Sequence, residues 1–259
     1  MAYINYNKEG KIAFIMLNRP KMNLVSFEMV VELDNIWKDF KDDPNLLVAI
    51  IGSTCENFTA GVDIKEILEM LRESDYVWKK SSMFGEKCAG PDGHSIMKPV
   101  IATLSGVVNG LGMWLTLQSD IRIATPDTSF GLSEGRLNFP VEFSAFLTRY
   151  IPRAVISELL FMGKRFSAQR FYDLGIINGI VEREQLMAEA VKTAEAICEI
   201  GPTSIKVMKQ LIDHSYDMDI RSLMALTASM IVPVVNSKDT KEALACFIEK
   251  RKPPWRIES

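Results

Sequence analysis

Apolar residues in the first half of the chain form two patterns: short continuous runs and longer stretches with helical spacing. A continuous run predicts a strand covered on both faces, and helical spacing predicts a helix with one buried side. The clearest helix is residues 26–40, where Ser26 is a favourable N-cap. The predicted strands are 3–7, 11–17, 46–52, 99–104 and 121–124, and the further helices are 63–71 and 113–117. This mixture of elements predicts an α/β fold.

Two segments between these elements show no regular period. Residues 72–95 are polar and mixed, and they predict a mobile surface segment. Residues 106–112 (GVVNGLG) predict a turn that leads into the helix at 113–117.

The pattern changes near Val141, after which helices dominate. Gly201 and Pro202 separate two of them. The predicted helices are 143–150, 153–162, 167–173, 184–199, 202–214, 219–231 and 239–250. We therefore divide the chain into an α/β domain, residues 1–199, and a C-terminal helical region, residues 200–259.

The composition is that of an ordinary globular protein. The chain has 259 residues, 47% of them hydrophobic and 24% charged, with a net charge of -3. Proteins that bind nucleic acids are usually basic, so we expect no nucleic-acid partner. We see no signal peptide and no run of about 20 apolar residues, the length that spans a bilayer. We therefore expect a cytoplasmic protein without a membrane partner.

The cysteines and histidines do not have the spacing of a metal site. The four cysteines are far apart in the sequence and form no CxxC pair. We expect reduced thiols and no metal. The two histidines are not arranged with a nucleophile as in a Ser-His-Asp hydrolase.

Residues 105–142 hold the strongest candidate for catalysis. A glycine-containing turn leads into an apolar helix, and Glu134 follows two residues after the sequence Phe-Gly-Leu. Apolar surroundings raise the pKa of a carboxyl group toward neutrality, so that it can both take and give a proton. Glu134 is therefore the first candidate for acid–base chemistry. The alternative is a surface or salt-bridged glutamate.

Four stretches carry the motifs of one family, in order and at family-like spacing. They are residues 18–23 (NRPKMN), 58–66 (FTAGVDIKE), 106–124 (GVVNGLGMWLTLQSDIRIA) and 239–255 (DTKEALACFIEKRKPPW). Over nearly its whole length the chain resembles the crotonase superfamily of enoyl-CoA hydratases and isomerases. The resemblance implies a spiral of ββα units and a C-terminal helical region that forms a homotrimer or homohexamer. It also implies an acyl-CoA thioester as substrate and no cofactor, since coenzyme A is part of the substrate.

The resemblance further implies an oxyanion hole, in which two backbone N–H groups stabilise the negative charge on the thioester oxygen. By motif, the donors are the N–H groups of Val62 and Leu111, where the family prefers Ala and Gly. Leucine adopts a positive φ less readily than glycine. The alternative for Leu111 and its flanking glycines is a helix-entry turn that binds no ligand.

Two glutamates hold a water molecule in the hydratases of this family. By motif, Trp114 replaces the first of them here and Glu134 matches the second. Family isomerases typically keep only the second. Glu142 has the spacing at which dienoyl-CoA isomerases carry a second proton carrier, so it is also a catalytic candidate. Its alternative is a glutamate in the first turn of the helix 143–150, favoured by the helix dipole.

Four residues are candidates for substrate binding. By motif, Lys21, Lys65 and Lys250 are expected to contact the phosphates of coenzyme A, Lys250 from a neighbouring subunit. Trp114 is expected to form a wall of the acyl pocket that favours a flat or cyclic acyl group. Its alternative is a core residue of its helix.

We therefore predict an acyl-CoA enzyme that stabilises a thioester enolate, with Glu134 as the proton shuttle. The first choice is isomerisation of a double bond in an enoyl- or dienoyl-CoA. The alternative reaction is hydration of an unusual enoyl-CoA, such as a cyclic dienoyl-CoA. An alternative of another class is a scaffold or RNA-binding protein that has lost catalysis. The retained Glu134 and the acidic composition count against this last alternative.

Overall fold

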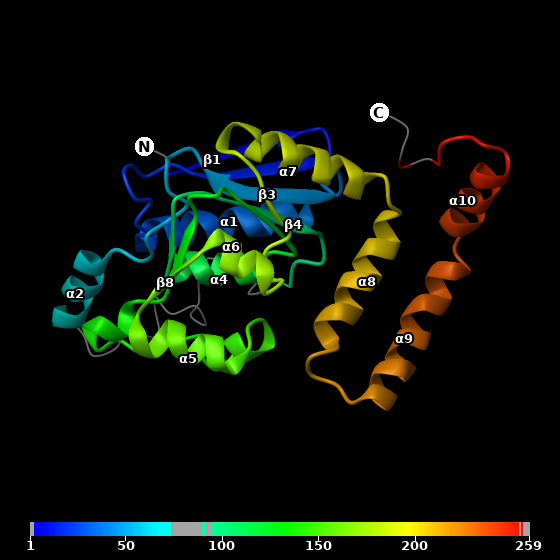
Figure 1. Cartoon of the computed structure of the whole chain (residues 1–259). Coiled ribbons are helices and arrows are strands. Elements are labelled where there is room, and N and C mark those ends of the chain that lie inside the picture. Colours follow the sequence, from blue (N-terminus) through cyan, green and yellow to red (C-terminus); the bar gives the residue numbers. More distant parts are fainter. Residues whose placement is uncertain (1–2, 74–89, 92–94, 254, 256–259) are drawn as a thin grey trace.

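A six-stranded sheet forms the centre of the chain's first part (Figure 1). The computed structural model describes residues 3–73, 90–91, 95–253 and 255. The strands, in spatial order, are β1 (Ile4–Glu9), β2 (Ile12–Leu17), β3 (Val48–Ser53), β4 (Val100–Leu104), β6 (Ile121–Ala124) and β9 (Gly179–Ile180). β1 and β2 pair antiparallel, and the other neighbours pair in parallel.

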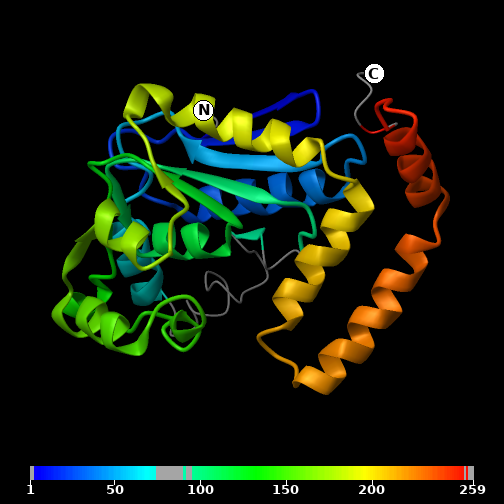
Figure 2. The ribbon, with the colours of Figure 1, turned by 45° about the vertical axis from the view of Figure 1, so that its right-hand side comes forward.

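Helices cover both faces of this sheet, which explains its continuous apolar strands. Helix α7 (Arg183–Cys198) packs on one face, where Ile50 and Ile101 belong to the same apolar cluster as Ala190. Helices α1 (Phe27–Asp42) and α4 (Leu111–Gln118) lie on the other face, as Figures 1 and 2 show. Alternate residues of each strand point to opposite faces, so both faces must be apolar.

A second, three-stranded sheet carries the segments that reach the candidate site. Its strands are β5 (Val107–Asn109), β7 (Ser129–Gly131) and β8 (Arg165–Ser167). β5 and β7 pair in parallel, with Asn109 opposite Gly131. The 3-10 helix η2 (Glu134–Leu137) follows β7 after two residues. The ends of β5 and β7 therefore bring the start of α4 next to Glu134.

The remaining helices are arranged around and beyond the two sheets. They are α2 (Ile64–Glu73), η3 (Leu147–Arg149), α5 (Arg153–Met162), α6 (Ala168–Asp173), α8 (Pro202–His214), α9 (Ile220–Val235) and α10 (Lys238–Ile248). Helices α8, α9 and α10 project from one side of the molecule (Figures 1 and 2).

Helix α9 has an apolar sequence but little cover. Within the part of the chain that the structure describes, none of its residues is buried, and Ile220, Met224 and Val235 are exposed. No single helix among the described residues is long and apolar enough to cross a membrane. The pair α9 and α10, bent by 64°, reaches that threshold by length and composition alone.

The α/β class and the C-terminal helices predicted from the sequence are confirmed. The predicted helix at 143–150 is wrong, because this segment forms turns and the short 3-10 helix η3. Phe143, Leu147 and Ile151 are buried there. Successive turns can bury every fourth residue as an α-helix does, so the spacing of the apolar residues did not distinguish the two structures.

The predicted turn at 106–112 is also wrong, because β5 occupies 107–109 and α4 begins at Leu111. Strands β7 and β8 were not predicted at all. Three residues are too few to show a period of two. The segment 72–95 lies mostly outside the described residues, and the domain boundary at 199 stays a prediction.

Asn23 ties together the two loops that precede α1 and α2. It is fully buried, and its Nδ2 lies 2.7 Å from Ser53 Oγ, 2.9 Å from Asn57 O and 3.0 Å from Phe58 O. Its Oδ1 accepts a hydrogen bond from the Arg19 amide at 2.7 Å. Its φ of +47° is one that asparagine tolerates better than most residues.

We predict that Asn23→Ala lowers the free energy of unfolding by about 3 kcal/mol, because it leaves several buried backbone groups without a partner. The exposed Asn5→Ala is the matched control and should change it by less than about 0.5 kcal/mol. Urea denaturation measures both. Equal stability of Asn23→Ala and the wild type would show that this network does not hold the loops.

Candidate active site

Two glycines bring the loop before α2 against the start of α4. Gly61 has a φ of +101° and Gly110 a φ of +55°, conformations that residues with a side chain rarely adopt. A Cβ placed on Gly61 would lie 3.2 Å from Asn109 O and 3.7 Å from Gly110 Cα. The two backbone segments therefore approach each other closely, and glycine is needed at both positions.

The backbone N–H groups of Val62 and Leu111 follow directly after these glycines. Leu111 is the first residue of α4, so its N–H has no acceptor within the helix. Across the described ranges, neither N–H donates a hydrogen bond. Two unpaired amide donors, one of them at the positive end of a helix dipole, suit a negatively charged oxygen.

Gly110, rather than Leu111, has the left-handed conformation at this turn. The residues with positive φ include Gly110 but not Leu111. A leucine side chain at the second position therefore causes no backbone strain. The departure from the family's preference for glycine at position 111 leaves the backbone geometry of the N–H unaffected.

Glu134 lies against the backbone of Gly110. A Cβ placed on Gly110 would come within 2.5 Å of Glu134 Oε1. Glu134 Oε2 is buried and has no hydrogen-bond partner among the residues that the structure describes. Burial raises the pKa of this carboxyl group, while hydrogen bonds from the backbone of Glu134 and Ser133 partly oppose the rise. The group therefore takes up a proton at a higher pH than an exposed glutamate does.

Trp114 stands one helical turn beyond Gly110. Its backbone N–H donates to Gly110 O at 3.3 Å, and its side chain is almost fully buried. The indole packs on Phe143, with ring centroids 5.0 Å apart, and is 6.2 Å from the ring of Phe146. Trp114 is thus part of an aromatic cluster, at the position where the resemblance places the first glutamate of the hydratases.

Glu142 belongs to the turn segment that packs on Trp114. Its side chain is half-buried, and its Oε1 is fully buried. The alternative of a first-turn glutamate on an α-helix is wrong, because no α-helix begins at Phe143. A role for Glu142 in proton transfer stays a prediction.

The structure places Lys21 on the loop before α1 and Lys65 in the first turn of α2, just after the loop that carries Val62. An ion pair of 2.9 Å between Arg19 and Asp63 joins these loops, and both lysines are exposed. Lys250 lies after α10, far from α2 in this chain (Figure 1). Lys250 is therefore not brought to the site by its own chain, and its contact with coenzyme A from a neighbouring subunit stays a prediction.

Sequence reasoning missed Asn23, Arg19 and Asp63 as residues that hold the site together. All three lie within the family-like motifs, which was the available signal. It also missed Phe143, which had been assigned to a helix. Among the residues that the structure describes, no three His, Cys, Asp or Glu side chains are grouped as metal ligands.

Comparison with known proteins agrees with this arrangement. The family model for enoyl-CoA hydratase/isomerase matches residues 7–258. The short-chain-enoyl-CoA hydratase of Clostridium acetobutylicum is 30% identical over 249 residues, which cover 95% of this chain and 94% of that protein. The mevalonyl-coenzyme A hydratase of Aspergillus fumigatus is 30% identical over 250 residues, covering 95% and 91%.

The fold also matches solved structures of this group. The crystal structure of an enoyl-CoA hydratase/isomerase from Mycobacterium paratuberculosis has a TM-score of 0.90 at 26% identity, and the match covers 98% of each chain. The family model spans nearly the whole sequence, and this fold match covers nearly the whole chain. The chain therefore belongs to the enoyl-CoA hydratase/isomerase family of the crotonase superfamily, and it is an acyl-CoA enzyme of that family.

Proposed function

We propose that this enzyme moves the carbon–carbon double bond of an enoyl- or dienoyl-CoA, with Glu134 as the proton carrier. One observation carries the proposal. The half-buried Glu134 side chain, with its buried Oε2, lies against Gly110, next to the unpaired amides, while position 114 holds a tryptophan. The site therefore has one well-placed carboxylate, and Trp114 supplies no second acid–base group.

In the proposed reaction, the thioester oxygen accepts hydrogen bonds from the N–H groups of Val62 and Leu111. Glu134 removes a proton from one carbon of the acyl group, and the C–H bonding electrons move into the conjugated enolate. The same carboxyl group then returns the proton to another carbon, which shifts the double bond without net gain or loss of atoms. Each oxyanion donor contributes about 2.7–4 kcal/mol in comparable sites.

The pKa of Glu134 suits this double role. A group that takes and gives the same proton works best when its pKa is near the working pH. Burial raises the pKa of Glu134 in that direction. Holding this carboxylate where little water reaches it costs folding free energy. A purely structural role for Glu134 would not explain that cost.

Hydration or dehydration is the second candidate, and the relatives favour it. The Clostridium acetobutylicum and Aspergillus fumigatus relatives are both named as hydratases. In that reaction, Glu134 activates the water molecule, alone or together with the half-buried Glu142. The flat aromatic face of Trp114 would suit an unusual substrate such as a cyclic dienoyl-CoA. The buried, orphaned Glu134 oxygen favours either reaction over a non-catalytic scaffold.

Self-association is proposed to occur through α8, α9 and α10. Helix α9 exposes Ile220, Met224 and Val235 along a surface that the described residues of its own chain leave uncovered. Exposed apolar surface of this kind is typical of a protein interface. Copies of this chain in a trimer or hexamer, as the resemblance implies, would cover it.

We predict that Glu134→Gln lowers kcat by about 10²–10⁴-fold, because the amide cannot take the proton. Binding of acyl-CoA, followed by calorimetry, should change by a few fold at most. The exposed Glu9→Gln is the matched control and should keep full activity. Undiminished turnover by Glu134→Gln would remove Glu134 from its proposed role.

The pH dependence follows from the raised pKa of Glu134. Turnover needs the charged carboxylate, so it should fall as the pH drops through this pKa, starting above the range of an exposed glutamate.

The raised pKa of Glu134 in the folded state also means that folding stability is lost as the pH rises through this pKa. Glu134→Gln should therefore melt at a higher temperature than the wild type at neutral pH, and this gain should vanish in acid. A gain that persists in acid would point to another cause.

We predict that Gly110→Ala abolishes turnover, because its Cβ would come within 2.5 Å of Glu134 Oε1. Gly10→Ala is a matched control. Gly10 has a φ of +54°, and a Cβ there meets nothing within 4 Å. Both glycines have a positive φ, but only the Cβ at position 110 would meet Glu134, so equal losses of activity would show that this contact is unimportant.

Mass spectrometry of enoyl-CoA products formed in heavy water separates the two reactions. An isomerase gives a product that gains no oxygen and gains deuterium only where the proton on Glu134 exchanges with solvent, whereas a hydratase adds the mass of water. Trp114→Glu restores a second carboxylate and should shift the products toward water addition. If wild-type enzyme already adds water to the enoyl-CoA without isomerising it, the first candidate is wrong and the second holds.

A further inference from the structure

Helix α4 has one stripe that differs from the rest of its surface. Leu111, Trp114 and Gln118 each keep 6–7% of their surface exposed, whereas Met113, Leu115, Thr116 and Leu117 keep at most 1%. Spacings of three and four residues place the first three on one side of the helix. These three side chains are therefore slightly less covered than the other four.

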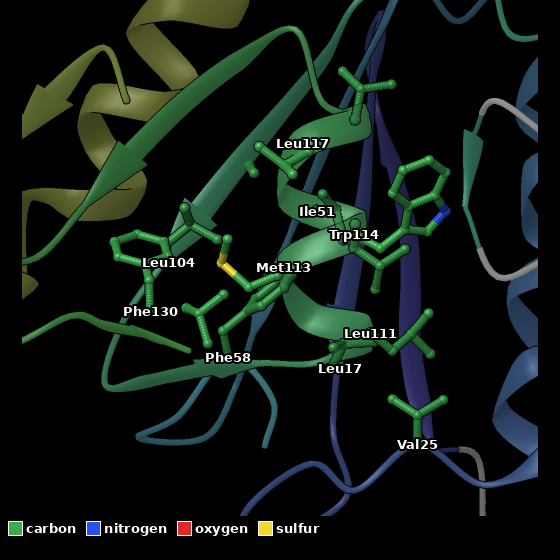
Figure 3. Close-up of a cluster of buried hydrophobic side chains, with 14 of the residues drawn as sticks. Leu17, Val25, Ile51, Phe58, Leu104, Leu111, Met113, Trp114, Leu117 and Phe130 are labelled. Carbon is green, nitrogen blue, oxygen red and sulfur yellow. The ribbon is translucent and has the colours of Figure 1, made fainter. Parts of the chain in front are cut away.

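Figure 3 shows the two sides of α4. Met113 and Leu117 point toward Leu104 and Phe130, inside the apolar core. Leu111 and Trp114 project on the other side, and the indole nitrogen lies on the ring edge that faces away from the helix. The stripe thus starts at the proposed oxyanion donor and continues past the indole.

Two polar atoms on this stripe are buried and have no hydrogen-bond partner in the described part of the chain. They are Trp114 Nε1 and Gln118 Oε1, and both side chains are more than nine-tenths buried. Native proteins rarely leave buried polar atoms unpaired, because the lost hydrogen bonds to water are not replaced. An indole N–H can only donate, so the partner that fits it is an oxygen that accepts.

The surroundings of the indole are otherwise apolar. Phe143 and Phe146 cover the ring of Trp114. A single donor in an apolar wall is the arrangement that fixes the orientation of a small ligand. Gln118 also lines a cavity of about 570 Å³ together with Arg149, Tyr150 and Lys209, and its buried Oε1 lies against the backbone of Gly90.

The backbone rise of the helix sets the scale for where this oxygen would lie along the acyl chain. Trp114 follows Leu111 by three residues, which is about 4.5 Å along the helix axis. An extended chain advances about 1.2 Å per bond. An acyl chain that runs along the stripe from Leu111 therefore passes Trp114 at about the fourth to sixth carbon.

We infer that the acyl group of the substrate carries a hydrogen-bond-accepting oxygen, a carbonyl or hydroxyl, at about the fourth to sixth carbon, and that the Trp114 indole N–H binds it. This inference rests on the proposed function, because it takes the Leu111 N–H as the anchor of the thioester. A plain alkyl chain would cover the indole N–H and leave it unpaired, so the site discriminates against unsubstituted acyl groups.

Binding of saturated ligands tests this inference independently of turnover. Octanoyl-CoA is compared by calorimetry with three analogues that carry an oxo group at the fourth, fifth or sixth carbon. We expect the wild type to bind at least one oxo analogue about three- to tenfold more tightly than octanoyl-CoA. In Trp114→Phe, which keeps an aromatic ring but lacks the N–H, the ratio of the two dissociation constants should approach one. Trp37→Phe, at a fully buried tryptophan of α1, is the matched control and should keep the wild-type ratio.

The inference is overturned if octanoyl-CoA binds the wild type as tightly as every oxo analogue, a result that needs no variant to fold. It is also overturned if folded Trp114→Phe keeps the wild-type ratio. If the wild type converts an enoyl-CoA but shows no oxo preference, only the inference fails. If it neither binds nor converts any acyl-CoA, the proposed function fails as well, and the inference with it.

Discussion

The close contact between the backbones at Gly61 and Gly110 is the constraint on which the site depends. The two segments are joined just before this contact, because Thr59 and Val108 form a parallel bridge and Asn109 N donates to Thr59 O at 3.0 Å. The bridge sets the distance between the amides of Val62 and Leu111. A side chain on either glycine would force the segments apart. The preorganised amides are therefore a product of backbone pairing and need no particular side chain of their own.

Strand pairing also positions the carboxylate of Glu134. β5 ends where α4 begins, and β7 ends just before Glu134, so one short parallel ladder places a helix N-terminus beside an acid. Burial then changes the chemistry of that acid, since its oxygen Oε2 has no partner within the described residues. The paired strands thus hold a carboxylate in surroundings that disfavour its charged form. Such perturbed groups are common at catalytic sites.

The elements that could be predicted from the sequence are those whose apolar pattern extends over many residues. The apolar strands β3 and β4 were visible because helices cover both of their faces. The three-residue strand β5 was not, since it owes its existence to its neighbours and not to its own composition. Glu134 was chosen from its apolar neighbourhood and from the resemblance. The contact with Gly110 that gives it a role depends on strand pairing, which a single sequence does not reveal. Phe143 was assigned to a helix that does not form, so its packing on Trp114 was not foreseen.

The exposed surface of α9 affects the stability of the C-terminal helices. A helix owes most of its stability to packing, and α9 buries none of its residues within the described part of the chain. If copies of the chain supply that packing, the law of mass action governs the order of the last three helices. Dilution would then loosen this end of the molecule while the sheet that holds the glycine pair keeps its own core.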